Sequence, residues 1–308
     1  MERHLTFAPG ELPDYFAVIQ PELERALGYY LPTGPEPDYK VFNEALGVAL
    51  LEGKRFRPML TVLGAEVVGG RFSTVLPAAV GIEYVHTSSL IFDDLPCMDN
   101  ATQRRGHLAL HLRYGEAVAV LVALTLLNTS YGLLLKAEAS QSLTRNAHSE
   151  LVKAIGPIGL IGGQFFDLTV ESQTRKTKTI DSARILKTSA LIGLSLRVGA
   201  LLSGATLQQL AALSSFADLV GMAYQISDDI TDRQEDSYRA KSPRANEFTI
   251  REGKTQSTVG LVSDAQSIIL DMFGSTRAAL LLCEVASYSA DLGGRLAGRS
   301  NDHPDREN

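Results

Sequence analysis

Two clusters of aspartates lie far apart in the chain, and strongly apolar sequence flanks both. Placing several carboxylates against apolar surroundings is costly unless cations neutralise them. Mg²⁺ prefers carboxylate, water and phosphate oxygens as ligands. The two clusters together therefore predict a group of magnesium ions that binds a phosphate or a diphosphate. The clusters consist of Asp93, Asp94 and Asp99, and of Asp228, Asp229 and Asp232.

The spacing within each cluster predicts how its carboxylates are presented. Asp228 and Asp232 are four residues apart, so a helix places them on one face, one turn apart. Asp93 and Asp99 are six residues apart, which puts them on different sides of a regular helix. Pro96 is expected to end that helix just before it, after which the chain can bring Asp99 back.

Basic residues near these clusters are candidates for binding phosphate groups. Arginine suits two-pronged recognition of phosphate, whereas lysine acts as a compact charge. The pattern fits two diphosphates, one held through metal ions and one held by lysine and arginine alone. The alternative is that the clusters are solvated helix ends with ordinary surface ion pairs, which contribute little. The basic candidates are Lys54, Arg55, Arg57, Arg104, Arg105, Lys187, Lys241 and Lys254.

Apolar residues recur at helical spacing along most of the chain. We therefore predict an all-α, single-domain helical bundle over residues 1–297, with a polar tail over 298–308. The charged stretch 233–254 directly follows the second cluster and is expected to act as a lid. The expected helices are Tyr15–Leu27, Asn43–Leu51, Pro58–Val68, Thr74–Phe92, His111–Leu135, Ala147–Gly159, Ile180–Leu202, Leu207–Asp232 and Thr258–Leu292.

The composition excludes several classes of protein. The chain has 308 residues with a net charge of −6, which argues against a nucleic-acid-binding surface. Two cysteines provide neither a disulfide framework nor a cysteine-rich metal site, so a reducing cytoplasm is the expected compartment. The most apolar run, Ala117–Leu127, is too short to cross a bilayer, so we expect no transmembrane segment.

An ordered set of motifs spread over residues 40–295 resembles the trans-isoprenyl diphosphate synthase (polyprenyl synthetase) family. This family includes the farnesyl and geranylgeranyl diphosphate synthases. An aspartate-rich motif alone is a weak signal, but the whole set in this order is specific. The matching elements are Gly53-Lys54-Arg55-Phe56-Arg57-Pro58, the segment His86–Gly106, Gly162-Gly163-Gln164 with Asp167, Lys187-Thr188, and Tyr224-Gln225-Ile226-Ser227-Asp228-Asp229 through Asp232.

The resemblance implies an all-α isoprenoid synthase fold around a deep central cavity, a homodimer, and condensation of isopentenyl diphosphate with an allylic diphosphate. It also implies that the six aspartates hold Mg²⁺, expected as three ions, on the allylic diphosphate. Lysine or arginine side chains, with Gln225 and Thr188 nearby, would assist there, and Lys254 lies in the expected lid. The assisting cations would be Arg104, Lys187 and Lys241, and the residues gripping isopentenyl diphosphate would be Lys54, Arg57, His86 and Arg105.

The same resemblance bears on product length. In this family a bulky aromatic residue five positions before the first aspartate often limits chain growth, and this chain has Ser88 there. Tyr84 lies one turn further from the metals and is a candidate floor of the product tunnel, about 13 Å along the helix from Asp93. The alternative is that Tyr84 simply packs in the core. A small Ser88 favours a geranylgeranyl product over a farnesyl one.

The chain departs from the family pattern at several positions. Ala101 and Thr102 replace two acids, and Ala123 with Leu124 replaces a Gly-Asp pair. Two other functions therefore stay open. A terpene cyclase shares the first acidic motif but usually lacks three aspartates in the second. A non-catalytic, regulatory subunit of a heteromeric synthase would not need both metal clusters.

Overall fold

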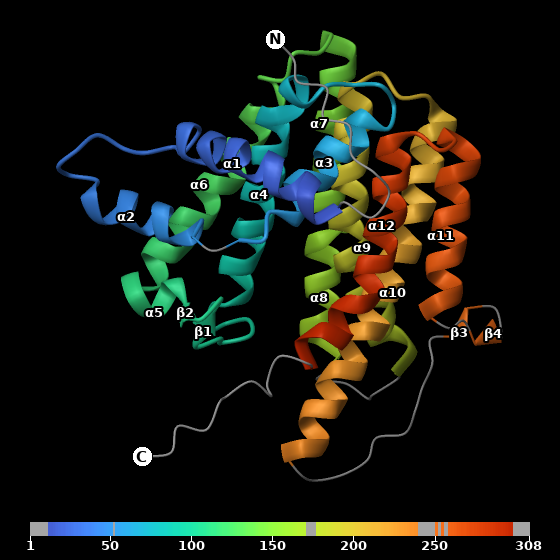
Figure 1. Ribbon diagram of the computed structural model, residues 1–308. Helices are drawn as coiled ribbons and strands as arrows, with labels where there is room; N and C mark the ends of the chain where they lie inside the picture. Colours follow the sequence, from blue (N-terminus) through green and yellow to red (C-terminus); the bar gives the residue numbers. More distant parts are fainter. Residues whose placement is uncertain are drawn as a thin grey trace, which may run out of the picture.

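The protein is described by a computed structural model that covers residues 12–51, 53–170, 177–239, 250–251, 254–255 and 258–297. Within these ranges, the side chains of residues 170, 177–188, 225, 227–239, 250–251, 254–255 and 290–297 lie outside the description. The described chain is almost entirely helical, which confirms the all-α prediction (Figure 1). Its helices are α1 (Leu12–Tyr29), α2 (Lys40–Ala49), α3 (Phe56–Glu66), α4 (Phe72–Asp93), α5 (Leu110–Tyr114), α6 (Glu116–Leu134), α7 (Gln141–Ile155), α8 (Leu160–Val170), α9 (Thr177–Leu202), α10 (Leu207–Arg239), α11 (Thr258–Phe273) and α12 (Arg277–Ala297).

Two short antiparallel hairpins complete the described elements. The first pairs β1 (Gln103–Arg104) with β2 (His107–Leu108), and it lies beside the C-terminal end of α4 (Figure 1). The second pairs β3 (Ile250–Arg251) with β4 (Lys254–Thr255). Neither hairpin contributes to a sheet that could form a core, so the helices alone build it.

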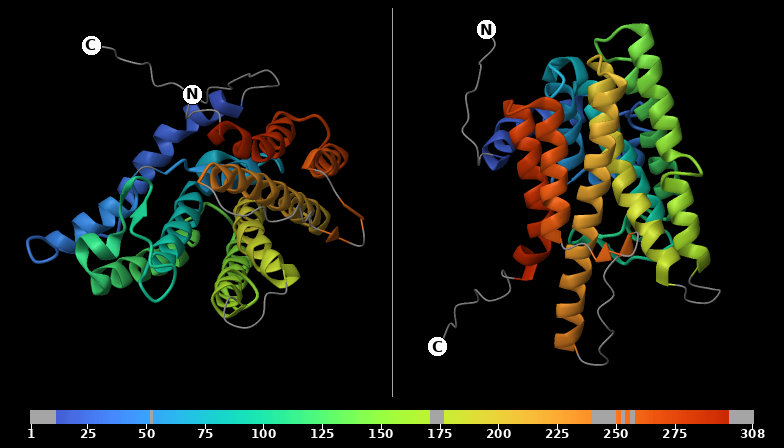
Figure 2. Two further views of the ribbon diagram at one scale, coloured as in Figure 1. Left: turned by 90° about the horizontal axis from the view of Figure 1, so that it is seen from below. Right: turned by 90° about the vertical axis from the view of Figure 1, so that its right-hand side faces the viewer.

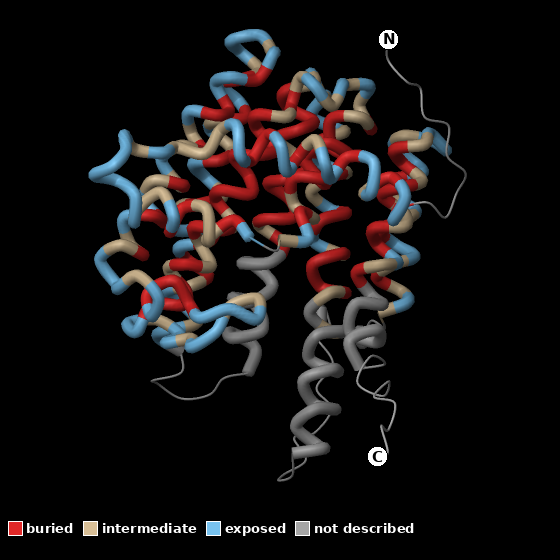
Figure 3. The backbone as a smooth tube through the Cα atoms, turned by 60° about the vertical axis from the view of Figure 1, so that its left-hand side comes forward, coloured by how far each residue is buried: buried red, intermediate tan, exposed pale blue. Residues whose placement is uncertain are grey.

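The helices form two packed groups that meet at α4. Helices α3, α9, α10, α11 and α12 pack against one another, whereas α4 packs along α6 and also touches α3 and α9. Figure 2 shows these two groups from below and from the side. Buried residues are concentrated along the inner faces of both groups (Figure 3). The core is therefore continuous through α4, the helix that carries the first aspartate cluster.

Helices α3 and α9 touch backbone to backbone, and glycine makes this possible. A Cβ atom added at Gly199 of α9 would lie 1.9 Å from the carbonyl oxygen of Thr61 on α3. A Cβ atom added at Gly64 of α3 would lie 2.2 Å from the carbonyl oxygen of Leu196 on α9. Lys54 lies two residues before the start of α3, and α9 carries Lys187, so both helices are connected to predicted phosphate-binding residues. The backbone contact fixes the separation of the two helices.

Two expected helices are each divided in the structure, and one helix was not predicted. Gly115, with φ of 87°, divides the expected helix His111–Leu135 into α5 and α6. Gly274, with φ of 64°, similarly separates α11 from α12. L-residues rarely adopt such positive φ values, whereas glycine adopts them freely, so it commonly follows a helix end. The third error is α8, whose apolar sequence was not predicted to be a separate helix.

The expected lid also differs from its prediction in part. The helix expected to end at Asp232 continues as α10 to Arg239, so the first residues of the stretch 233–254 are helical. Residues 240–249 and 252–253 lie outside the described part of the chain, as does the expected tail 298–308. A lid thus remains a prediction for the rest of this stretch.

Within the described part of the chain, three apolar stretches are long enough to cross a membrane by length and composition alone: α4, α6 and Gln141–Thr169. Helix α6 continues to Leu134, beyond the run that ended at Leu127, so the expectation that it is too short was wrong. In α4, 72% of the apolar window is buried within the protein's own core. That burial accounts for the apolar sequence of α4.

Candidate active site

The first aspartate cluster lies where α4 ends. The helix stops at Asp93, and Asp94 is its C-cap. The backbone N–H of Asp99 then donates to the carbonyl oxygen of Asp93 over 2.9 Å, so the turn around Pro96 brings Asp99 back to the helix end. This confirms the predicted effect of the proline. Side chains of Asp93 and Asp94 are only 8% and 4% exposed.

Asp94 is paired with an arginine from the neighbouring hairpin. Arg104 Nε donates to both carboxylate oxygens of Asp94, at 3.0 and 3.1 Å, and its Nη2 also contacts Asp94. The hydrogen bond to Asp94 raises the pKa of Arg104, and the charges of Asp93 and Asp99 raise it further. The sequence had assigned Asp94 to the metals and Arg104 to the allylic diphosphate. The structure instead joins them to each other.

The hairpin that presents Arg104 has a tight turn. Arg105 and Gly106, at its tip, have φ of 52° and 78°. Positive φ at both central residues is the signature of a two-residue type I′ turn, whose twist matches paired strands. The turn places Arg104 on a strand facing α4 and leaves Arg105 at the tip. Arg104 and Arg105, although adjacent in sequence, therefore contact different partners, Asp94 and the carbonyl oxygen of Leu51.

Of the four residues predicted to grip a second diphosphate, Arg57, His86 and Arg105 are brought close together. Arg57 Nη1 lies 3.1 Å from His86 Nε2, although α3 and α4 carry them. Arg105 Nη1 donates to the carbonyl oxygen of Leu51 at 3.3 Å, and its charge acts on both Arg57 and His86. Lys54, which is exposed, precedes α3 by two residues.

The protonation state of the His86 imidazole follows from its burial and from these neighbours. Burial holds the pKa of His86 well below its ordinary value of 6.5, and the charges of Arg57 and Arg105 lower it further. The ring is thus neutral at pH 7. Because Arg57 donates to Nε2, the ring proton resides on Nδ1. Within the described structure, His86 Nδ1 and Arg57 Nε are buried without hydrogen-bond partners.

Unpartnered buried donors in a cationic cluster fit a polyanionic ligand. Each such group costs about 1–3 kcal/mol when left without a partner. Phosphate oxygens would accept from both, and burial lowers the pKa of Arg57 and of Arg105, so an anion would offset the cost of their charges. This cluster can therefore bind a diphosphate without a metal ion.

The fourth arginine of this region, Arg55, is buried in an ion network. Its Nη1 donates to Glu83 of α4 at 2.9 Å, and its Nε and Nη2 donate to Glu24 of α1 at 2.7 and 3.1 Å. It also contacts the carbonyl oxygen of Leu50. Arg55 and Glu83 are 3% and 1% exposed. Sequence reasoning missed Glu83, although an acid within the apolar stretch of α4 is a signal that a buried cation partner exists.

The second aspartate cluster belongs to α10, but its side chains lie outside the description. The same holds for Gln225 on α10, for Lys187 and Thr188 on α9, and for Lys254 in β4, while Lys241 lies entirely outside. Tyr224 of α10 is described, and it lies near enough to Arg57 to influence the pKa of that guanidinium. The second motif therefore begins beside the cation cluster, and Asp228 follows Tyr224 by one helical turn.

A complete metal site cannot be assembled from the first cluster alone. Among the described side chains, no group of three or more histidines, cysteines or acids is arranged to hold a metal ion. Asp93 and Asp94 still provide buried carboxylates at a helix C-terminus, where the helix dipole disfavours negative charge. This donor set fits a magnesium ion whose remaining ligands come from another element.

Tyr84 is a core residue of α4. Its side chain is fully buried, and its hydroxyl donates to the carbonyl oxygen of Leu27 at 2.8 Å. Of the two interpretations of this residue, the structure favours packing over an open tunnel floor. Ser88, one turn further along α4, is also buried. The apolar neighbours of Tyr84 come from α1, α2 and α6.

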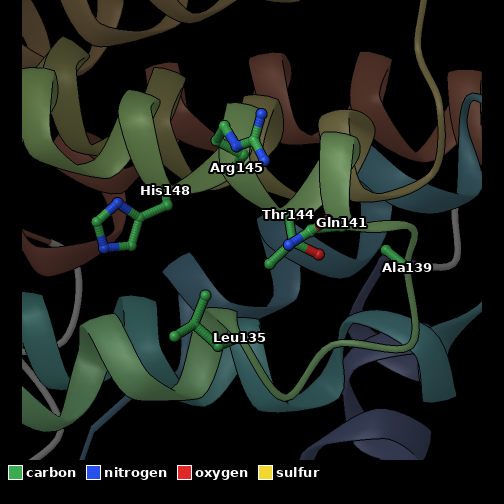
Figure 4. Close-up of a pocket in the computed structure, with 6 residues that line it drawn as sticks. All are labelled: Leu135, Ala139, Gln141, Thr144, Arg145 and His148. Atoms are coloured by element: carbon green, nitrogen blue, oxygen red, sulfur yellow. The ribbon is translucent and has the colours of Figure 1, made fainter.

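Two other features lie on α8 and at the junction of α6 with α7. Gln164 and Asp167, part of the motif set, are half-buried on α8. A pocket of about 480 Å³ lies between the end of α6 and the start of α7 (Figure 4). The β1–β2 hairpin lies near the other end of α6 (Figure 1). Arg145 and His148 contribute to the wall of the pocket. This pocket contains none of the predicted site residues.

Comparisons with known proteins agree with this geometry. The model of the family "Polyprenyl synthetase" matches residues 39–257. The chain is 37% identical over 233 residues to a geranylgeranyl diphosphate synthase of Pantoea ananas, covering 74% of this chain and 76% of that protein. It is 40% identical over 196 residues to a chloroplastic geranylgeranyl pyrophosphate synthase of Capsicum annuum, covering 62% of this chain and 53% of that protein.

A solved structure is also similar. The crystal structure of an FPP/GFPP synthase from Zymomonas mobilis superposes with a TM-score of 0.80 at 30% identity. The superposition covers 91% of this chain and 99% of the other. The two proteins thus share one helical architecture over nearly their whole lengths.

Proposed function

The chain belongs to the polyprenyl synthetase family of trans-prenyltransferases, and we propose that it joins isopentenyl diphosphate to an allylic diphosphate. The product is a short-chain trans-prenyl diphosphate, and geranylgeranyl diphosphate is the proposed length. The observation that carries the proposal is the pair of neighbouring sites at the end of α4. One presents buried carboxylates, and the other presents Arg57 and His86, each with an unpartnered buried donor.

The metal-independent cluster is the proposed site of isopentenyl diphosphate. Arg57, Arg105 and Lys54 supply positive charge, and neutral His86 supplies an N–H donor. These groups bind the diphosphate end and leave the alkene free. The alkene attacks the allylic carbon as the allylic C–O bond breaks, and inorganic diphosphate departs. A proton is then lost from the new five-carbon unit to the departing diphosphate.

The carboxylate end is the proposed site of the allylic diphosphate. The residues that would hold Mg²⁺ are Asp93 and Asp99 of the first cluster, Asp94 if Arg104 releases it, and Asp228, Asp229 and Asp232. When bound, magnesium ions neutralise the charge that develops on the leaving diphosphate. Lys187, Thr188, Gln225 and Lys241 are proposed to lie near that diphosphate, and the stretch containing Lys254 to exclude water. Arg104 keeps the hairpin against Asp94.

A geranylgeranyl product is supported by the residues that precede the first cluster. Ser88 is small and lies on the α4 face that also carries Tyr84. The two relatives named above are both geranylgeranyl diphosphate synthases. The test is to incubate the purified chain with Mg²⁺, isopentenyl diphosphate and primers of five, ten and fifteen carbons. A twenty-carbon diphosphate is expected, and a cyclised hydrocarbon or no product from any primer would contradict the proposal.

A homodimer is proposed because large apolar side chains are exposed on α6 and α8. Leu121 and Leu124 of α6 are about half exposed, as are Ile161 and Phe165 of α8. Contiguous exposed apolar surface usually marks an interface. Light scattering after gel filtration should give twice the chain mass of 33.3 kDa. Leu121→Glu should shift the mass toward the monomer, whereas Lys136→Glu, a change at an exposed residue just beyond the end of α6, should not.

A further inference from the structure

Arg55 lies inside the loop that carries the proposed diphosphate-binding cations, but its guanidinium is bound by Glu24, Glu83 and the carbonyl oxygen of Leu50. It is the N-cap of α3, in a left-handed conformation with φ of 50° and ψ of 27°. Non-glycine residues adopt this conformation rarely and at a cost. The three anchors of its guanidinium, Glu83, Glu24 and the carbonyl oxygen of Leu50, hold it there. This fixes how the chain passes from Lys54 to Arg57.

Glu83 connects that loop to the helix that carries His86. The two residues are three positions apart on α4, so they lie on one face of the helix. Arg57, two residues after Arg55, contacts His86 over 3.1 Å. The salt bridge between Arg55 and Glu83 and the contact between Arg57 and His86 thus join α3 to α4 at successive turns. Movement of the first pair must alter the second.

Glu83 is also the counter-charge of the cluster. Its carboxylate acts on Arg55, Arg57 and Arg105 together. Three guanidinium groups would otherwise repel one another in a partly dry region. Burial raises the pKa of Glu83, and Arg55 is the largest influence that lowers it again. A buried acid beside an anion site is unfavourable for binding by charge alone, so its presence needs a geometric reason.

We infer that Arg55 and Glu83 are a positioning pair that pre-forms the metal-independent diphosphate site. Neither residue touches the ligand. The pair keeps Arg57, Arg105 and His86 in one arrangement before a diphosphate arrives, so the ligand does not have to order them. This inference rests on the proposed function only for the identity of the natural ligand, isopentenyl diphosphate.

The direction in which Glu83→Gln changes the affinity for diphosphate distinguishes a positioning role from a purely electrostatic one. Glu83→Gln removes a negative charge next to an anion site, so electrostatics alone predicts tighter diphosphate binding. Positioning predicts weaker binding. Arg55→Lys keeps the charge but removes the fork that bridges Glu24 and Glu83, so electrostatics alone predicts no change. Small displacements of oriented binding groups can cost a hundredfold, and we expect about tenfold weaker binding for each variant.

The experiment is calorimetric titration of inorganic diphosphate into the full chain with EDTA present, so that only the metal-independent site binds. Glu66→Gln is the matched control. Like Glu83, Glu66 is a carboxylate whose pKa is raised by burial, and it accepts from the Tyr15 hydroxyl at 2.9 Å. It is the last residue of α3, at the opposite end of that helix from Arg57. The control should bind like the unmodified chain.

The double variant with Arg57→Ala provides a further test, because a merely structural role of Glu83 predicts no coupling between Glu83 and Arg57 in diphosphate affinity. If Glu83 acts through Arg57, adding Glu83→Gln to Arg57→Ala weakens diphosphate binding less than Glu83→Gln does alone. Thermal melts accompany each titration. If Glu83→Gln does not fold, Arg55→Lys decides the outcome by itself.

Unchanged or tighter binding in the folded variants overturns the inference, as does additive behaviour with Arg57→Ala. Absence of any diphosphate binding by the unmodified chain in EDTA also overturns it. The prenyl-transfer assay reports separately on the proposed function. If the unmodified chain is active but its variants bind diphosphate normally, the proposed function stands and the positioning role of Arg55 and Glu83 is refuted.

Discussion

Replacing Gly199 by alanine should destabilise the protein by forcing α3 and α9 apart. The added Cβ atom would lie 1.9 Å from the Thr61 carbonyl oxygen and 2.9 Å from the Ala65 nitrogen. Both are backbone atoms, so no side chain can rotate away. Real Cβ contacts are essentially never under 3.0 Å, and 3.0 minus 1.9 requires at least a 1.1 Å shift.

The expected magnitude follows from two opposing terms. Overpacking that shifts backbone costs about 1–3 kcal/mol, and we take the upper end because both contacts are rigid. Alanine regains about 1 kcal/mol of helix propensity over glycine. The net loss is about 2 kcal/mol. With an unfolding entropy of about 2.1 cal/mol/K per residue over this chain length, Tm should fall by about 3 °C.

Gly193, also on α9, provides the control. A Cβ atom there would meet only the Ala217 Cβ atom, at 3.5 Å, which is an ordinary contact. Gly193→Ala should therefore leave Tm unchanged or raise it. Differential scanning calorimetry measures both variants. Equal stability of the two would refute the view that backbone contact sets the spacing between α3 and α9.

The same displacement should reach the site. Arg57 lies in the first turn of α3, and its 3.1 Å contact with His86 depends on where that helix lies. Gly199→Ala should therefore raise KM for isopentenyl diphosphate at a temperature where the protein is still folded. Gly193→Ala should not change KM.

Three further outcomes are expected. Arg104→Lys removes the two-pronged contact to Asp94 and should lower the free energy of unfolding by about 1 kcal/mol after discounting for the partial exposure of Arg104, measured by urea titration. Because the pKa of His86 lies well below 6.5, an NMR titration should show its ring neutral at neutral pH. Stability should then decrease as pH falls through about 6.5, where the unfolded chain binds a proton that the folded ring does not; a ring titrating near 6.5 contradicts this. Tyr84→Phe removes the bond to the Leu27 carbonyl and should cost about 1 kcal/mol of stability. Tyr84→Ala, which removes the ring, should leave the product length unchanged, and a longer product would restore the role of Tyr84 as tunnel floor.

Local sequence rules predicted much of what the structure contains. Periodicity predicted the all-α fold, and Pro96 predicted the turn that returns Asp99 to the end of α4. These are consequences of residues within a few positions of one another. The boundary errors have the same local origin. Gly115 and Gly274 were available as signals, but long apolar periodicity on either side concealed them.

Contacts between residues far apart in the sequence could not be predicted from these local rules. Glu83 and Arg55 are 28 positions apart, and Arg55 and Glu24 are 31 apart. Local rules assigned Arg55 of the basic loop no partner, whereas the fold buries it in a salt bridge with Glu83 and places Arg57 beside His86. Asp94 and Arg104 were likewise each expected to face a ligand, and the hairpin joins them.

The types of residue in this chain determine the chemistry that is available. Carboxylates select hard cations, arginine and lysine select phosphate, and apolar periodicity selects helices, because these preferences belong to the side chains themselves. Which member of each charged group faces a ligand and which one holds the scaffold depends on helix packing. The close approach of α3 to α9, and of both to α4, decides which charges are near enough to neutralise one another.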